Sequence, residues 1–322
     1  MLKTINTFKS KKSEIKYIII AICTYKRSEK LERLLKNLCK LKYPDIKTSI
    51  LVVDNDYEKS AFDIYQKFKH KLNILYCNEP QKGFSNTRNK ALTESINLNA
   101  THLAFIDDDE ISTKNWLINH IDFYNKFKNI YISSGPTYKK FDKEYPNYIK
   151  NNKTFKVVSH KALGQIKKTC ASGNVFFPLN IVKENNIYFS ETFNFLGSED
   201  TDFFSRLNHA GYTIGWNYNA INYEIVGEER ANIKWIIKRA FHNGYSVSVT
   251  RFINKKNKYK IIYYIMEKSI MIMLNAILIP FSLLKGYTGL LNSYVRLIKN
   301  YGKLYGAIVV LKNKNFLVME TI

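Results

Sequence analysis

Cysteine is scarce in this chain of 322 residues, which has only four, scattered along its length. The four are Cys23, Cys39, Cys77 and Cys170. No two of them form a CxxC pair or have the spacing of metal ligands, which argues against a disulfide scaffold and against a cysteine-held metal. Isolated cysteines of this kind are typical of small buried side chains in a reducing compartment.

A signal peptide and a long apolar run are also missing. The first 16 residues carry basic side chains without an apolar core of signal-peptide length. An uncharged apolar stretch covers Ser269–Leu284, between Lys268 and Lys285, with Pro280 inside it. A helix needs about 20 apolar residues to cross a bilayer. We therefore expect a cytoplasmic protein in which this stretch lies in a membrane interface, the alternatives being a core helix or a full span.

Acidic residues are too few to balance the basic ones. The chain has 27 Asp and Glu against 50 Lys and Arg, a formal net charge of +23, which demands an anionic partner. From Glu229 to the end there are 16 Lys and Arg but only three Glu, beside the apolar stretch, and no nucleic-acid-binding module is recognisable. This distribution favours an anionic membrane surface, on the inner face of the cell membrane, over nucleic acid.

The remaining composition is that of a folded protein. A hydrophobic content of 45% excludes wholesale disorder, and the length allows one large domain or two smaller ones. Because the composition changes after Gly227, we expect a catalytic domain over residues 1–228. A helical, basic region that associates with the membrane is expected over residues 229–322.

The first domain alternates short apolar runs with helical patterns, which predicts a mostly parallel, doubly wound α/β sheet with right-handed crossovers. Four strands are expected before residue 107, and four later runs are expected to complete the same sheet. The stretch Tyr138–Lys156, rich in Lys, Asn and Tyr, is expected to be a mobile loop. The eight predicted strands are Tyr17–Ile22, Ser49–Val53, Asn73–Tyr76, the run ending at Ile106, Ile130–Ser134, Ser172–Phe177, Thr213–Trp216 and Ala220–Val226.

Three consecutive carboxylates, Asp107, Asp108 and Asp109, end the fourth of these strands. Adjacent anions repel one another unless a cation or strong donors lie among them. In open α/β sheets ligands bind beyond the carboxyl ends of the strands, where Thr24 and Asp54 also fall. A solvated acidic turn is the plain alternative, but this position favours a divalent metal that holds a diphosphate.

A second acidic pair, Glu199 and Asp200, precedes a helical pattern. Carboxylates in the first turn of a helix are favoured by the helix dipole, so a simple cap is the alternative to a functional role. A carboxylate within hydrogen-bond reach of a reacting hydroxyl can also accept its proton. Our candidate for such a general base is Asp200, with Glu199 as the alternative.

Six segments together resemble the family 2 glycosyltransferases of the GT-A fold, a Rossmann-like sheet. They occur in that family's order between Tyr17 and Val226, and FIDDDE resembles its D-x-D motif. The segment YEIVGEERANIKWIIKRAFHNGYS further resembles bacterial polysaccharide-building transferases with a basic, membrane-associated C-terminus. The six are IIIAICTYKR, VVDN, KGFSNTRNKAL, FIDDDE, SGNVFF and SEDTDF.

The resemblance implies roles for individual residues. Asp109 would hold the metal, Mn²⁺ or Mg²⁺, and Glu224 stands where family members often have a histidine ligand. Gly173 and Asn174 would lie on the acceptor side. The residues that would bind the nucleotide-sugar are Thr24, Tyr25, Arg27, Asp54, Gly83, Arg88, Asn89, Asp107 and Asp108.

The implied reaction moves a sugar, with inversion, from a nucleoside-diphosphate donor, expected to be a UDP-hexose or a UDP-N-acetylhexosamine. The acceptor would be a hydroxyl of a glycan or a lipid-linked saccharide in bacterial surface polysaccharide biosynthesis. Nucleotidyltransferases share acidic strand ends, but the chain has no G-x-G-rich first loop. The other alternative is a basic membrane- or nucleic-acid-binding protein on a non-catalytic GT-A-like scaffold, against which the complete set of acidic motifs argues.

Overall fold

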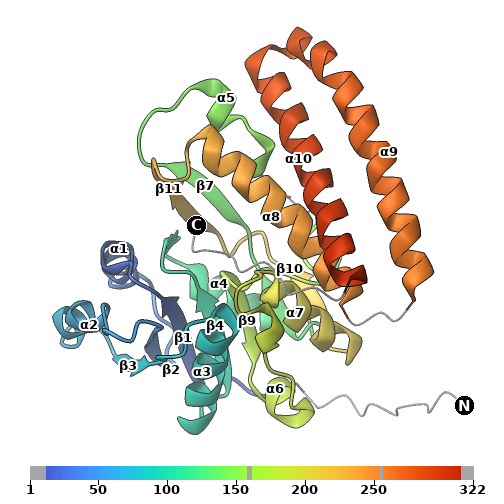
Figure 1. Cartoon of the computed structure of the whole chain (residues 1–322). Coiled ribbons are helices and arrows are strands. Elements are labelled where there is room, and N and C mark those ends of the chain that lie inside the picture. The colour runs from blue at the N-terminus through green and yellow to red at the C-terminus, as the bar shows by residue number, and fades with distance from the viewer. Residues whose placement is uncertain (1–11, 158–161, 254–256, 313–322) are drawn as a thin grey trace, which may run out of the picture. The chain divides into compact units, whose positions relative to one another are not determined.

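The computed structural model describes residues 12–157, 162–253 and 257–312 (Figure 1). The chain forms two compact units, and each contains segments that are distant in sequence. The first unit comprises Met1–Tyr138, Val157–Asn194 and Glu199–Glu224, and the second comprises Lys139–Lys156, Phe195–Ser198 and Ile225–Ile322.

The first unit is built on an eight-stranded sheet with the order β3-β2-β1-β4-β9-β6-β10-β8. Its first four strands are parallel, which confirms the mostly parallel α/β fold. Strand β9 is antiparallel to both β4 and β6, so β6 and β10 run in the direction of β4, and only β9 and the edge strand β8 run the opposite way. The strands are β1 (Tyr17–Thr24), β2 (Lys47–Asp54), β3 (Ile74–Asn78), β4 (His102–Ile106), β6 (Ile132–Ser134), β8 (Ile166–Lys167), β9 (Asn174–Pro178) and β10 (Ile214–Trp216).

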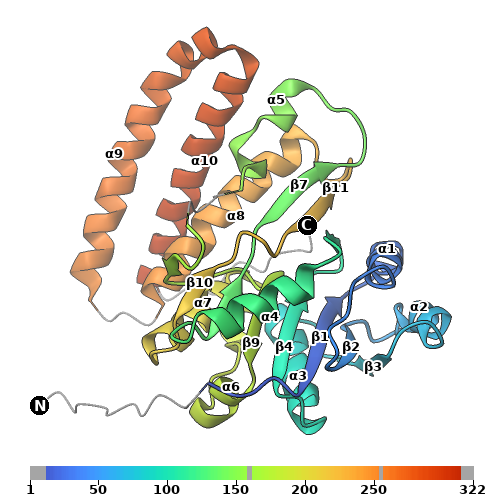
Figure 2. The same ribbon diagram turned by 180° about the vertical axis from the view of Figure 1, so that it is seen from behind.

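Helices cover both faces of this sheet (Figures 1 and 2). Successive residues of a strand point to opposite faces, so Ile18 and Ile20 of β1 enter one core while Ile19 enters the other. A strand buried on both faces reads as a continuous apolar run, which is why β1 was recognisable in the sequence. One face carries α1 (Ser28–Leu38), α2 (Phe62–Phe68) and α4 (Trp116–Lys126), and the other carries α3 (Phe84–Asn97), α6 (Asn180–Asn185) and α7 (Glu199–His209).

A second sheet of three strands has the order β5-β11-β7, formed by β5 (Glu110–Ser112), β11 (Asn222–Val226) and β7 (Thr137–Phe141). The prediction that residues 220–226 complete the main sheet is therefore wrong. Strand β11 pairs in antiparallel register with β5, the short strand that follows the three aspartates, and Glu224 lies opposite Glu110. This pairing brings a late segment of the chain to the acidic end of β4.

The second unit is helical. It contains α8 (Ile233–Phe252), α9 (Lys258–Ser282), the 3₁₀ turn η3 (Leu283–Lys285) and α10 (Gly286–Leu311). A Cβ atom on Gly244 of α8 would collide with the carbonyl oxygen of Lys299 on α10, so this glycine permits the two helices to approach closely. Among the described residues, only the stretch Lys258–Leu311 is long and apolar enough to qualify as a possible membrane span.

The segment predicted to be a mobile loop, residues 138–156, is ordered in part. It contains the short helix α5 (Asn147–Lys150) and the 3₁₀ turn η1 (Lys153–Phe155). The ring of Phe155 stacks on Trp235 of α8, with 5.8 Å between ring centroids. The prediction failed because the contact that orders this segment comes from a residue 80 positions later.

Candidate functional site

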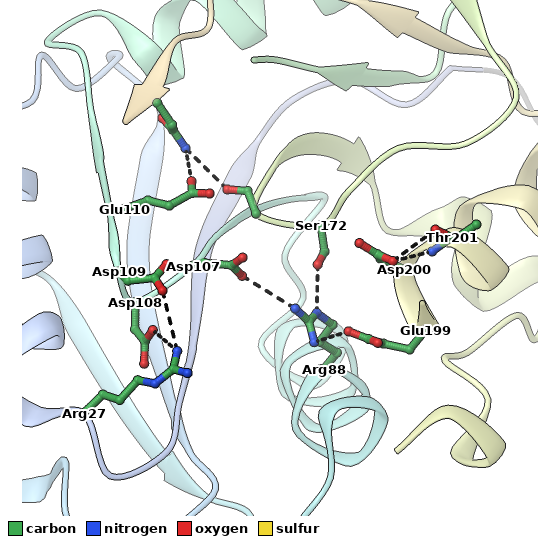
Figure 3. Close-up of polar contacts among 12 residues, drawn as sticks. Arg27, Arg88, Asp107, Asp108, Asp109, Glu110, Ser172, Glu199, Asp200 and Thr201 are labelled. Atoms are coloured by element: carbon green, nitrogen blue, oxygen red, sulfur yellow. Dashed lines mark hydrogen bonds and ion pairs between the residues drawn. The ribbon is translucent and has the colours of Figure 1, made fainter. Parts of the chain in front are cut away.

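The acidic end of β4 is held by donors from the end of β1 and the turn that follows it. Asp108 is buried and accepts hydrogen bonds from Thr24 Oγ1 at 2.8 Å and from Arg27 Nη1 at 3.2 Å (Figure 3). The same Arg27 nitrogen lies 3.7 Å from Asp109 Oδ2. Burial raises the pKa of Asp108, and Arg27 opposes that shift. The donors that three adjacent carboxylates require are therefore present.

Arg88 of α3 lies on the other side of this cluster and joins it to α7. Its Nη1 donates to Glu199 Oε1 at 2.8 Å, and its Nε donates to Ser172 Oγ at 3.0 Å. Its Nη2 lies 3.6 Å from Asp107 Oδ1 (Figure 3). The guanidinium thus connects the carboxylates that end β4 to the first turn of α7. Ser172 was not predicted, although it directly precedes Gly173 in the SGNVFF segment.

The two acidic residues that begin α7 have different surroundings. Glu199 is buried, and this burial raises the pKa of its carboxyl group to about 7, against the opposing effect of Arg88. Asp200 is only partly buried, and its Oδ1 accepts a hydrogen bond from the backbone N–H of Thr201 at 2.6 Å. Glu199 is thereby committed to the arginine, while Asp200, in the same first turn of α7, remains partly accessible. Figure 3 shows the two carboxylates with their partners Arg88 and Thr201.

Glu110 is a fourth carboxylate at this site, and the sequence analysis did not identify it. It is buried, and its Oε2 accepts a hydrogen bond from Asn222 Nδ2 of β11 at 2.7 Å. Burial, together with the charges of Asp107 and Asp109, raises its pKa well above the ordinary value. Its position directly after the three aspartates was a signal, but its partner on β11 depends on a strand pairing over more than 100 residues.

Gly173 lies against this cluster. A Cβ atom added to it would be 2.7 Å from both Asp107 Oδ2 and Glu110 Oε1, closer than a carbon and an oxygen can approach without displacement. Only glycine therefore fits between the backbone before β9 and these two carboxylates. The sequence analysis placed Gly173 on the acceptor side, and the structure places it beside the acidic end of β4.

Asn174, predicted to lie on the acceptor side, has a buried side chain whose hydrogen-bonding groups are used within the protein. Its Oδ1 accepts from Trp116 Nε1 at 2.8 Å and from His120 Nε2 at 2.9 Å. Its Nδ2 donates to the carbonyl oxygens of Pro136 at 2.8 Å and Ala220 at 2.7 Å. The residue thereby joins the start of β9 to three other segments, namely α4 and the chain at Pro136 and at Ala220.

Asp54 likewise has its carboxylate committed inside the protein. The side chain is fully buried and accepts hydrogen bonds from the N–H groups of Ala61 and Asp56 and from the Tyr76 hydroxyl, at 2.8, 3.1 and 3.0 Å. It shapes the loop after β2 and does not present its oxygens at the surface. Asp56, which was not predicted, has an Oδ2 atom without a hydrogen-bond partner among the described residues.

The loop before α3 approaches the same edge of the sheet. The N–H of Gly83 donates to Asn55 Oδ1 at 2.9 Å, and a Cβ at Gly83 would collide with Asn194. Lys82 Nζ lies 4.6 Å from the centroid of the Tyr25 ring. These contacts join the loop before α3 to the loop after β2 and to the turn after β1.

The side chain of Asn89, for which the resemblance implies a nucleotide-binding role, pairs with the backbone of Phe189. Its Nδ2 donates to the carbonyl oxygen of Phe189 and its Oδ1 accepts from the N–H of Phe189, both at 2.8 Å. The amide thus pairs like one residue of a sheet with the segment that leads to α7. We assign Asn89 a structural role in positioning that segment.

The donor set at the acidic end of β4 suits a hard divalent cation such as Mg²⁺ or Mn²⁺, which prefers carboxylate oxygens. Within the described ranges, no three His, Cys, Asp or Glu side chains are grouped as a ready metal site. A cation that also binds substrate phosphates needs only one or two protein carboxylates. Asp109 fits that requirement, and Glu224 lies opposite Glu110 on the neighbouring strand.

Comparisons with known proteins agree with this architecture. Residues 19–185 match the model of the family described as Glycosyl transferase family 2. The chain is 29% identical over 237 residues to the succinoglycan biosynthesis protein ExoM of Rhizobium meliloti (strain 1021), covering 72% of this chain and 74% of that protein.

Solved structures share the fold. TarS 1–349 from S. aureus, in complex with UDP-GlcNAc, superposes with a TM-score of 0.52 at 15% identity, over 94% of this chain and 93% of that one. The mannosyltransferase PcManGT from Pyrobaculum calidifontis, in complex with GDP-Man and Mn²⁺, gives a TM-score of 0.55 at 14% identity, over 94% and 76%. With the family model matching more than half of its length, this chain belongs to glycosyl transferase family 2.

Proposed function

We propose that this protein transfers a sugar, with inversion at the anomeric carbon, from a UDP-sugar to a hydroxyl of a glycan or lipid-linked acceptor during bacterial surface polysaccharide biosynthesis. The observation that carries the proposal is the bridge made by Arg88, which connects Asp107 at the end of β4 to Glu199 at the start of α7. The Arg88 guanidinium thereby connects the proposed donor side of the site to the proposed acceptor side. The name of the relative from R. meliloti and the UDP-GlcNAc bound to TarS support the choice of pathway and donor.

On the donor side we assign Asp109 to a divalent cation and Asp107 to the nucleotide. Asp108 already accepts hydrogen bonds from Thr24 and Arg27, so it holds the acidic turn in place. When bound, a divalent cation stabilises the negative charge that grows on the departing diphosphate. The Mn²⁺ bound together with GDP-Man in PcManGT supports this assignment. The buried Asp56, with an oxygen that lacks a partner, is our candidate for a contact with the nucleoside in place of Asp54.

On the acceptor side we assign the general base to Asp200. As the acceptor oxygen forms its bond to the anomeric carbon, the bond from that carbon to the diphosphate oxygen breaks. The acceptor hydroxyl proton passes to the Asp200 carboxylate. Direct displacement inverts the anomeric centre, so an α-linked donor gives a β-linked product. Glu199 is a weaker candidate because Arg88 occupies one of its oxygens and the residue is buried.

The test is calorimetric titration with UDP, GDP, CDP and dTDP, each with Mn²⁺ and with EDTA, on the wild type and on Asp109→Ala. We expect one nucleotide to bind only with metal, and Asp109→Ala to abolish that binding. As a matched control, Asp122→Ala removes a carboxylate from α4, outside the cluster at the end of β4, and should leave binding unchanged. Binding that is equal with EDTA and unaffected by Asp109→Ala would overturn the proposed metal site.

We also propose that the basic second unit associates with an anionic membrane surface on the cytoplasmic side. The 16 basic residues after position 228 support this proposal, as does the apolar character of Lys258–Leu311. Such a surface would bring the enzyme to a lipid-linked acceptor.

A further inference from the structure

The helix α9 has two unlike faces. Ile261 and Tyr264 are buried with Phe252 of α8 and Ala307 of α10 in one apolar cluster, and Asn275 is buried about three turns further along. This inner face fastens the helix to its neighbours. The remaining circumference of α9 has no such covering among the described residues.

An apolar stripe runs along the opposite face. We define the outer stripe as Met266, Ile270, Met273, Ile277 and Phe281, which follow one another at intervals of three or four residues and therefore lie in line. Their exposed fractions are between 53% and 65%. Monomeric soluble proteins rarely expose a continuous apolar surface of this length. The outer stripe therefore calls for an apolar covering.

The width of the exposed surface argues against a second copy of the chain as that covering. In a coiled coil the apolar seam is narrow and charged residues flank it. Here Leu274 and Leu278, beside the outer stripe, are apolar and exposed as well, at 47% and 55%. No charged residue occurs between Lys268 and Lys285. An apolar face this broad fits the acyl region of a lipid layer better than a helical seam.

Charged and aromatic residues at both ends of α9 indicate that the helix contacts the headgroups of anionic lipids. Lys258 and Lys260 lie in the first turn, and Lys285 follows the last turn. Tyr259 at one end and Tyr287 just beyond the other are exposed by 85% and 76%. Lysine and tyrosine both favour the headgroup level, where the ammonium group meets anionic phosphate and the phenol ring lies half in water.

The neighbouring helix α10 decides the orientation. Figures 1 and 2 both show α9 and α10 side by side as a hairpin closed by η3. Arg296 lies ten residues after Gly286, or about 15 Å along α10, level with the middle of the apolar part of α9. Arg296 and Lys299 are both exposed. A hairpin that crossed the bilayer would place these two charges inside the hydrocarbon, which is unfavourable.

We infer that α9 lies in the plane of the membrane, with its outer stripe in one leaflet and α10 on the water side. The 16 uncharged residues Ser269–Leu284 extend about 24 Å as a helix, short of the roughly 30 Å hydrocarbon core, which also disfavours a span. This inference deepens the proposed membrane association, since it names the contact face and excludes the crossing orientation.

The first test is flotation of the full chain with phosphatidylcholine vesicles, with and without phosphatidylglycerol. We expect binding to the anionic vesicles that weakens as salt rises, and an at least tenfold loss of vesicle partitioning in Ile277→Glu. Ile166→Glu is a matched control, because Ile166 is 57% exposed in the first unit and Ile277 is 58% exposed. Met273→Gln, which adds no charge, should give an intermediate loss. Equal binding by all four proteins would overturn the inference.

The second test measures depth. In a Cys39→Ser background, which removes the exposed cysteine, an environment-sensitive dye is attached to cysteine introduced at Ile270, Ile277 or Phe281. An in-plane helix predicts that a quencher near the headgroups quenches all three sites alike. If α9 instead crossed the bilayer, a quencher near the ends of the lipid acyl chains would quench the dye most strongly at position 277. That result would overturn the in-plane orientation.

Two further measurements distinguish this inference from dimer formation and from the proposed nucleotide site. If Ile277→Glu disrupts a lipid-free dimer in sedimentation velocity and no protein floats with vesicles, a second copy covers the stripe and the inference is wrong. Nucleotide titration of Ile277→Glu should match the wild type, because the site on the first unit is unchanged. Loss of nucleotide binding by Asp109→Ala with vesicle binding intact would keep the two proposals distinct.

Discussion

Arg88 Nη1 donates to Glu199 Oε1 at 2.8 Å, and both side chains are buried. The pair lies between the acidic end of β4 and the start of α7, so it has a structural role in addition to any effect on the reaction. Removing one partner leaves an uncompensated charge in a buried place, which is costly in folded proteins.

Arg88→Ala should therefore reduce both stability and transfer. We expect the free energy of unfolding to fall by about 3 kcal/mol, because the Glu199 carboxylate loses its partner. Urea unfolding measures this change. Glu199→Gln is the matched variant, since glutamine keeps an oxygen that can accept from Arg88, and it should cost less. Additive losses in the double variant Arg88→Ala/Glu199→Gln would contradict a direct coupling between the two residues.

The pH dependence of stability should carry the signature of Glu199. Its folded-state pKa is raised to about 7 from an ordinary value near 4.5, so the folded protein binds a proton more tightly than the unfolded chain. The resulting stabilisation is fully present below about pH 4.5 and is lost as pH rises to about 7.

The measurement is the stability of the wild type minus that of Glu199→Gln, across that pH range and in EDTA. We expect the difference to decrease steadily from pH 5 to 7 and to stay level above about pH 8. A difference that instead increases with pH would show that the Arg88 charge, and not burial, dominates the pKa of Glu199.

Asp200→Asn should separate catalysis from donor binding. If Asp200 accepts the acceptor proton, the transfer rate falls by about 10²-fold or more while metal-dependent nucleotide affinity stays within twofold. Glu199→Gln in the same assay should reduce the rate less. A slow Glu199→Gln variant beside an active Asp200→Asn variant would reverse the assignment of the base.

Gly173→Ala should disturb the acidic end of β4 without removing a charge. The new methyl group would lie 2.7 Å from oxygens of Asp107 and Glu110, so the carboxylates must move. We expect metal-dependent nucleotide affinity to weaken by about tenfold, equivalent to about 1.4 kcal/mol. Gly227→Ala is the control, because the three atoms nearest to its added Cβ all belong to the end of the Glu229 side chain, which can move aside.

Asn174→Ala should act on folding alone. It leaves the buried donors of Trp116 and His120 and the Ala220 carbonyl oxygen without the Asn174 side chain as a partner, while the Pro136 carbonyl oxygen keeps the N–H of Asn222. We expect a loss of about 3 kcal/mol in the free energy of unfolding. Nucleotide affinity, measured at a temperature where the variant is folded, should be unchanged. A loss of nucleotide affinity without a loss of stability would instead show that Asn174 contributes to binding.

The sequence was sufficient to predict those features of the fold and the site that depend on the local pattern of apolar and polar residues. The apolar run of β4 and its abrupt end at Asp107 predicted both a buried strand and the edge where ligands bind. The same topological rule placed Thr24 and Arg27 close to Asp108, and the structure brings them together. These inferences needed only the periodicity of the strands and the direction of the crossovers.

The failures involve partners distant in sequence. The hydrogen-bond partners of Asn174 lie on three other segments, so they are not evident from the residues next to it in the sequence. Glu110 was overlooked because Asn222 and the pairing of β11 with β5 lie more than 100 residues away. Asp54 and Asp56 are two residues apart, and only the folded loop shows that the first is used by its own backbone.

The reversed direction of β9 has a consequence for how such an enzyme can diversify. Because β9 is antiparallel to β4, Asn174 pairs with Ile106, and the segment before β9 meets the carboxylates at the end of β4. The residues proposed to hold the nucleotide all precede position 110, whereas the proposed base and the segment around Gly173 come later. Substitutions in the later part of the chain can therefore alter the choice of acceptor while the nucleotide chemistry is inherited intact.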